Sequence, residues 1–213
     1  MLEPTLSEPK RSTWLTVTIV VLLLGVAVIV GVLVLTLGRT NSTTGSEDID
    51  LTAILPPIDP ATLPQITIDH DVWLFDRSLV GTGARDFVAD FVWILSIEAE
   101  AVRTYDVELA RAVTQGRRAT EVAELIERNT ELGITTTATY EFDEFRVVLV
   151  PTDQVRPQLA VVAYGIGKFT DTSATGDVTA RTVDIAETYL LARARGGKVF
   201  IVDVIPPPPG LES

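Results

Sequence analysis

Residues 14–37 read WLTVTIVVLLLGVAVIVGVLVLTL, and this stretch determines how the rest of the chain is organised. It contains no charged residue, no proline, no asparagine and no glutamine. A helix of about 20 apolar residues spans the hydrocarbon core of a bilayer. The sequence therefore predicts one transmembrane helix, preceded by a short tail at residues 1–13 and followed by a folded domain on the far side.

Basic residues near this segment indicate its orientation. Lys10 and Arg11 precede it, whereas Arg39 is the only base close behind it. The positive-inside rule therefore places the N-terminus in the cytoplasm and the domain outside the cell membrane, with Trp14 as an interfacial anchor. The apolar run is longer than the core of a cleaved signal peptide, which favours an uncleaved, single-pass signal anchor.

Two small residues, Ala27 and Gly31, share one face of the predicted helix because they are four positions apart. Small residues at this spacing let a second helix approach closely, so this face is a candidate helix contact within the membrane. The alternative is that alanine and glycine are ordinary constituents of a span.

Composition narrows the classes of function. The net charge is −12 and there is no cysteine, so disulfides, thiolate metal sites and cysteine nucleophiles are excluded. The domain beyond the span holds most of the acidic excess, which disfavours nucleic acid as a partner. The abundance of valine, threonine, arginine and proline suggests a bacterial envelope protein.

Beyond the span, the pattern predicts a linker, one domain and a tail. Residues 38–64 are rich in serine and threonine and then in proline, which predicts a spacer that holds the domain off the bilayer. Residues 65–205 form the predicted domain, and residues 206–213 are a proline-rich tail.

Hydrophobic periodicity predicts an α+β fold for the domain. Apolar residues at helical spacing predict helices at residues 86–102, 105–113 and 120–132, the last one ending at Gly133. Residues 66–74 alternate and predict a short strand or an extended lead-in. Four β-rich segments follow, at residues 135–150, 159–170, 178–193 and 198–205. We expect about three helices to cover one face of a curved antiparallel sheet of four or more strands.

Three segments of the domain carry a resemblance to a known family. They are DFVADFVWILSIEAEAV, RTYDVELARAV and the closing GGKVFIVDVI. Together they resemble the nuclear transport factor 2-like superfamily over residues 83–205, which implies a cone of helices over a bent sheet. One span followed by such a domain looks like the actinobacterial mammalian-cell-entry-associated proteins and the intermembrane-space domain of plastid-division proteins. That fold hosts enzymes, ligand binders and interaction modules alike.

The resemblance also indicates where a site can lie. Enzymes of the superfamily use an aspartate, histidine or tyrosine inside the cone. The candidates of that kind here are Tyr105, Asp106, Tyr140, Tyr164 and Tyr189. Phe91, Leu95 and the four tyrosines are the candidate lining of a cavity in the cone. The alternative is that these side chains pack in the core or at its rim.

No catalytic residue, cofactor site or metal site is predicted. His70 is the only histidine, and its neighbours Asp69 and Asp71 would point away from it on a strand. The only concentration of basic residues comprises Arg103, Arg111, Arg117 and Arg118. They have two interpretations. Either they pair with acidic residues on a solvated helix face, or they form a docking patch for an acidic partner.

These observations lead to three hypotheses of function. The first is a non-enzymatic, membrane-anchored interaction or assembly module of an envelope complex. The second is a domain that binds a lipid or another small apolar molecule in the cone. The third is an isomerase- or hydrolase-like enzyme, which requires a buried carboxylate beside a tyrosine. Membrane or envelope proteins are the expected partners, and a homodimer is a further expectation.

Overall fold

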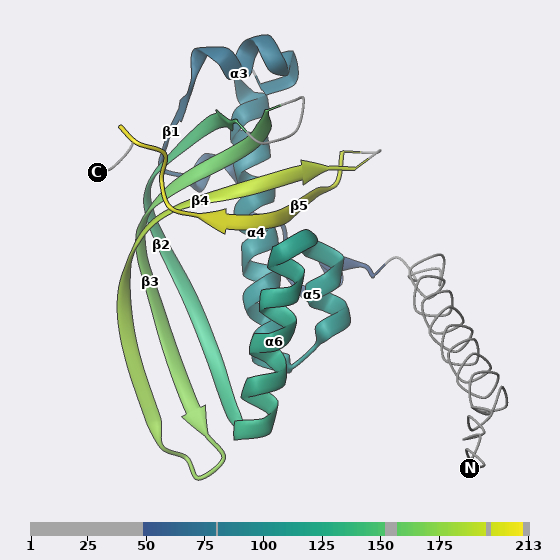
Figure 1. Cartoon of the computed structure of the whole chain (residues 1–213), viewed down its shortest axis with the longest axis vertical. Helices are drawn as coiled ribbons and strands as arrows, with labels where there is room; N and C mark the ends of the chain where they lie inside the picture. The colour runs from purple at the N-terminus through teal and green to yellow at the C-terminus, as the bar shows by residue number, and fades with distance from the viewer. Residues whose placement is uncertain (1–48, 80, 152–156, 195–196, 211–213) are drawn as a thin grey trace, which may run out of the picture. The chain divides into compact units, whose positions relative to one another are not determined.

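The long helix α4 (Thr82–Thr104) packs against a strongly curved sheet of five strands (Figure 1). The structure is a computed structural model and describes residues 49–79, 81–151, 157–194 and 197–210. The predicted tail and span lie outside these ranges, as do Lys10, Arg11 and Arg39. No helix among the described residues is long and apolar enough to cross a membrane.

The three predicted helices are confirmed as α4, α5 (Val107–Val113) and α6 (Gly116–Leu132). Tyr105 ends α4 in the left-handed conformation, with φ of 58°. Asp106 then begins α5, because its Oδ1 accepts a hydrogen bond from the Leu109 backbone N–H at 2.9 Å. Gly133 ends α6 with φ of 61°, as predicted for a C-terminal cap.

The predicted meander is present as β2 (Ile134–Val150), β3 (Gln158–Ser173), β4 (Val178–Arg193) and β5 (Val199–Ile205). A fifth strand, β1 (Gln65–Ile68), pairs with β2 in parallel. The sheet is therefore mixed, and the expectation of a wholly antiparallel sheet is wrong. Parallel neighbours need a long crossover between them, and α4, α5 and α6 supply it because they lie between β1 and β2 in the chain.

Residues 66–74 do not form one extended segment. β1 ends at Ile68, and a short helix, α3 (His70–Phe75), follows. The only buried residue of α3 is Val72, which joins the core, while Trp73, Leu74 and Phe75 are exposed. Alternation over so few residues does not distinguish a strand from one helical turn with a single buried contact.

The proline-rich part of the expected linker packs on the domain from residue 49 onward. It contains α2 (Leu51–Ile54) and the 3-10 turn η1 (Pro60–Thr62). Leu51 is buried in the core. Trp93 on α4 donates its indole N–H to the Leu55 carbonyl oxygen at 3.0 Å, and Arg85 donates to the Leu63 carbonyl oxygen at 2.8 Å. These contacts explain why the segment is attached instead of free.

A second turn, η2 (Arg77–Leu79), links α3 to α4 and is stabilised by Asp76. The Asp76 carboxylate accepts hydrogen bonds from the backbone N–H and the hydroxyl of Ser78 at 2.9 and 2.6 Å, and from Arg193 at 2.8 Å. The Ser78 hydrogen bonds, supported by the charge of Arg193, hold the pKa of Asp76 below its usual value.

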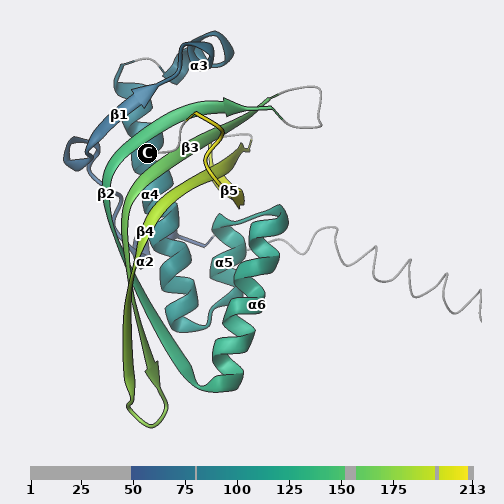
Figure 2. The ribbon, with the colours of Figure 1, turned by 60° about the vertical axis from the view of Figure 1, so that its left-hand side comes forward.

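The sheet bends where a glycine and an irregularity face each other on β3 and β2. A Cβ atom on Gly165 would lie 2.2 Å from the Glu141 carbonyl oxygen, so no other residue fits at this position without a shift of the backbone. The register of β2 shifts between Phe142 and Glu144 at the same level. The bend wraps the sheet around α4 and α6 (Figure 2) and creates its concave face.

Candidate functional site

A cavity of about 350 Å³ lies between α4, α6 and the concave face of the sheet. Its middle is apolar and is contributed by both helices and by β2, β3 and β4. The residues that form this middle part are Val102, Leu125, Ala138, Phe169 and Ile185. Phe91 and Leu95 of α4 do not line this cavity and are buried in the core.

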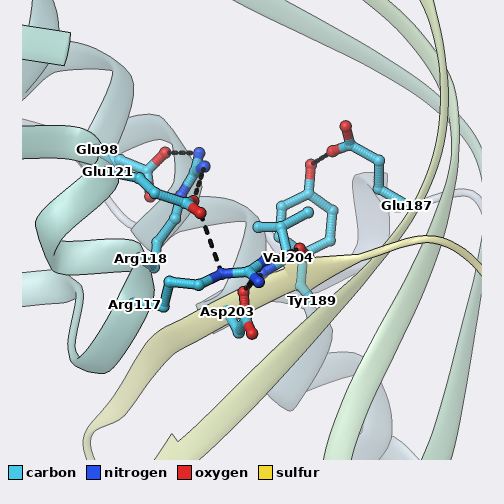
Figure 3. A network of polar contacts seen from close by, with 8 residues as sticks. All are labelled: Glu98, Arg117, Arg118, Glu121, Glu187, Tyr189, Asp203 and Val204. Atoms are coloured by element: carbon cyan, nitrogen blue, oxygen red, sulfur yellow. Dashed lines mark hydrogen bonds and ion pairs between the residues drawn. The ribbon is translucent and has the colours of Figure 1, made fainter. Parts of the chain in front are cut away.

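One end of the cavity holds an ion pair between two helices (Figure 3). Glu98 of α4 is only 4 % exposed, and its carboxylate accepts two hydrogen bonds from the Arg118 guanidinium of α6, of which the Nε–Oε2 contact measures 3.0 Å. Burial opposes the charge of Arg118, but Glu98 raises the pKa of Arg118 above its ordinary value. Glu121 lies 3.6 Å from the same guanidinium. The two side chains therefore form a fixed, hydrogen-bonded wall of the cavity.

Two tyrosines line the same end. Tyr189 is 2 % exposed, and its hydroxyl donates a hydrogen bond of 2.7 Å to Oε2 of the exposed Glu187, as Figure 3 shows. Burial, with the added effect of Glu187, raises the pKa of Tyr189 well above its ordinary value. Burial and the charge of Glu98 likewise raise the pKa of Tyr140. Both phenols therefore stay protonated at neutral pH, and each can donate a hydrogen bond, as Tyr189 does to Glu187.

A second polar group lies near the C-terminal end of α6. Asn129 donates to the Thr136 hydroxyl at 3.0 Å, and that hydroxyl donates to Asp171 at 2.6 Å. Arg181 donates to the same carboxylate at 3.0 Å. Asn129 follows Arg118 by eleven positions on one helix, so the two polar ends are about 16 Å apart along its axis. The cavity is therefore elongated, with an apolar middle and polar ends.

The rim combines charge with exposed apolar surface. Arg128 and Leu132 of α6 face the cavity, as do Val183 and Glu187 of β4. All four are exposed residues. A ligand would enter between α6 and β4, where apolar surface already meets water.

The structure divides the residues that the sequence singled out. Tyr140 and Tyr189 line the cavity, and the ring of Phe91 lies 4.9 Å from that of Tyr189 in the core beneath it. Tyr105 is at the end of α4, where its hydroxyl lies 2.7 Å from the Thr135 hydroxyl. Tyr164 packs with a small apolar cluster that lies away from the cavity. Asp106 is used as a helix cap.

The other candidates lie outside the cavity. His70 is an exposed residue at the start of α3, and no group of three histidine or acidic side chains within the described ranges could hold a metal ion. Arg103 and Arg111 pair with Glu100 and Glu108 of their own helices, at 2.5 and 2.6 Å.

The acidic lining of the cavity was not predicted from the sequence, where Asp106 was the only acidic candidate. Glu98, Asp171 and Glu187 all line the cavity. A signal for Glu98 existed, because it lies four positions after Ile94 and four before Val102 and thus on the buried stripe of α4.

Comparison with known proteins finds no family that matches the chain and no matching curated protein. The chain has a distant likeness to several solved structures. The intermembrane space region of the chloroplast protein ARC6 is 15% identical, with a TM-score of 0.39 over 53% of this chain and 90% of that one. A protein from Catenulispora acidiphila is 13% identical, with a TM-score of 0.42 over 58% of this chain and 92% of that one. Neither likeness assigns a function.

Proposed function

We propose that the domain binds a small amphipathic molecule in the cavity. The observation that carries this proposal is the cavity itself: about 350 Å³, with an apolar middle between two polar ends. Ligand sites of proteins usually enclose about 300–1,000 Å³ and are mostly apolar with a few placed polar groups. The polar ends favour a ligand with polar groups and an apolar body over a purely apolar one.

Binding is favoured over catalysis by the state of the lining groups. The third hypothesis requires a buried carboxylate beside a tyrosine. The buried carboxylate, Glu98, is held by two hydrogen bonds from Arg118, and the carboxylate beside Tyr189 belongs to the exposed Glu187. Their raised pKa values keep both phenols protonated at neutral pH, so neither is available as a general base. These groups are suited to orient a ligand, so we propose a non-enzymatic domain.

The proposal includes a membrane anchor at residues 14–37, with the domain outside the cell, supported by the apolar sequence of that segment and its flanking bases. It also includes a nuclear transport factor 2-like cone, supported by the three helices on a bent sheet. Because the chain has no cysteine, Thr5→Cys and Ser46→Cys test the orientation with an impermeant thiol reagent on intact cells. We expect the reagent to label position 46 alone. Labelling of position 5 alone would show the opposite topology and contradict this part of the proposal.

Binding is tested with the full chain in mild detergent. The probe is 10-hydroxydecanoic acid, which has an apolar body and a polar group at each end. Ala138→Trp fills the middle of the cavity, and Thr139→Trp is the matched control because the next residue on β2 faces the opposite side of the sheet. Native mass spectrometry counts the bound molecules, and circular dichroism confirms that each variant is folded.

We expect one molecule bound to the parent and to Thr139→Trp, and binding about ten-fold weaker to Ala138→Trp, a loss of about 1.4 kcal/mol. Equal occupancy in all three proteins, or none in the parent, would contradict the proposal.

Assembly with envelope proteins is a second proposed role. It is favoured by a separate observation, the exposed aromatic surface of Trp73 and Phe75 on α3. A pull-down from membranes tests it, since Trp73→Ser would reduce recovery of a stoichiometric partner, and unchanged recovery would refute it.

A further inference from the structure

Most of β4 forms the edge of the sheet. It pairs with β3 from Val178 to Leu190, but with β5 only from Thr188 to Arg193. Among the described residues, no strand pairs with the outer side of residues 178–187. This segment therefore presents backbone N–H and C=O groups that a further strand can use.

This edge lacks proline, lysine and a β-bulge, three of the features that usually prevent pairing, and its charged residues Arg181, Asp184 and Glu187 are of both signs. Residues 178–187 read VTARTVDIAE, with no proline and no lysine. Two of their apolar side chains are exposed, Val178 at 64% and Val183 at 45%. The opposite edge differs, because α4 and the lead-in residues Leu55 and Ile58 line a groove along residues 137–140 of β2.

We infer that residues 179–187 pair antiparallel with the same segment of a second copy of this chain, with the two-fold axis at Val183. The two-fold axis runs perpendicular to the sheet, so the same face of both copies lies on the same side of the combined sheet. A residue a given number of positions before Val183 then faces the partner residue the same number of positions after it. In this register Val183 faces its own counterpart. Thr182 faces the partner's Asp184, which can accept a hydrogen bond from the threonine hydroxyl.

Charge complementarity favours this register over the one centred one residue later. Arg181 faces the partner's Ile185, and the diagonal position holds the partner's Glu187. Arg181 already donates to Asp171 through Nη1, and its other guanidinium N–H groups can serve the partner's Glu187. Glu187 has an oxygen available, since Oε2 alone accepts the Tyr189 hydrogen bond. The register centred one residue later instead brings Asp184 opposite the partner's Asp184, and like charges directly opposite are destabilising.

Disulfide trapping tests the dimer in the full chain, in membranes of expressing cells, because the parent has no cysteine. Val183→Cys places two thiols directly opposite, with Cα atoms about 4.5–5.5 Å apart, within the range for a disulfide. Val178→Cys is the control: it is exposed on the same edge, but its counterpart lies ten positions further along, about 33 Å away.

Rapid dimer formation by Val183→Cys on oxidation, about ten-fold above that of Val178→Cys, is the expected result. Equal trapping at both positions indicates random collision and overturns the inference, as does no trapping at position 183. Val183→Lys gives a second measurement, because it places two ammonium groups on the axis. We expect native mass spectrometry to find the parent dimeric and this folded variant monomeric, and a dimeric variant or a monomeric parent refutes the inference. Val183 and Glu187 also line the cavity rim. The dimer is therefore tested without added ligand, and binding is tested at Ala138, outside the paired segment, so the two proposals can fail separately.

Discussion

Replacing Arg118 by methionine tests whether the ion pair in the cavity is shielded from water. Methionine keeps an apolar chain but leaves the Glu98 carboxylate, 4 % exposed, without its guanidinium. Stranding a buried charge costs roughly 3–5 kcal/mol. Because the Arg118 side chain is 24 % exposed and some water reaches the site, we expect about 3 kcal/mol. For a domain of this size the melting temperature falls by about 6–12 °C.

The reciprocal variant should cost less. Glu98→Gln leaves a guanidinium that is partly solvated and still has Glu121 at 3.6 Å, so we expect a loss of about 1–2 kcal/mol. The double variant removes the stranded carboxylate and should be more stable than Arg118→Met alone by at least about 1 kcal/mol.

Urea unfolding of the full chain in mild detergent, followed by tryptophan fluorescence, measures these differences from midpoints at constant slope. The reasoning is refuted if Arg118→Met costs no more than Glu98→Gln, or if the double variant loses the sum of the two single losses. Either result would show that the two charges are not coupled in a desolvated site.

Three further predictions concern the bend, the turn before α4 and the phenols. Gly165→Ala puts a methyl group 2.2 Å from a backbone oxygen and should lower the free energy of unfolding in urea by about 3 kcal/mol. Gly176→Ala meets open space and should cost about 1 kcal/mol, because of its φ of +88°. Equal losses would refute the steric argument. Asp76→Ala should lose about 1 kcal/mol at neutral pH. Because the folded pKa of Asp76 is lowered, its contribution to stability is present above about pH 4 and is lost as pH falls through that pKa. The unfolding free energies of parent and variant should therefore become equal by about pH 2. A difference that stays constant with pH would contradict this. Tyr140 and Tyr189 should keep their protons at about pH 11. The double variant Tyr140→Phe, Tyr189→Phe should therefore show the same rise in tyrosinate absorbance as the parent at that pH. A smaller rise in the variant would refute the burial of the two phenols.

Much of the fold follows from local patterns. The stripe of Phe87, Phe91 and Leu95 repeats every four residues and predicts α4, which burial of all three confirms. The boundary residue Gly133 and the meander from β2 to β5 were predictable for similar reasons, since capping and β-rich runs depend on neighbours in the chain. The parallel pairing of β1 was not, because it depends on where four successive helices return the chain.

The cavity lining was predictable only in part. Tyr140 and Tyr189 were named as candidates and do line it, but Tyr164 belongs to the other face of the sheet. A strand alternates faces with each residue, so a bulge such as that between Phe142 and Glu144 changes which side chains point inward, and the sequence does not show it.

The sequence by itself determined the apolar segment at residues 14–37, the absence of cysteine, the acidic balance and the order of the helices α4 to α6 and the strands β2 to β5. These properties depend on composition and on spacing over a few residues. The tertiary structure alone decided that Glu98 and Arg118 meet inside a cavity and that residues 178–187 of β4 form an unpaired edge. Both features depend on contacts between segments distant in the chain, which packing around the bent sheet brings together and which no local pattern encodes.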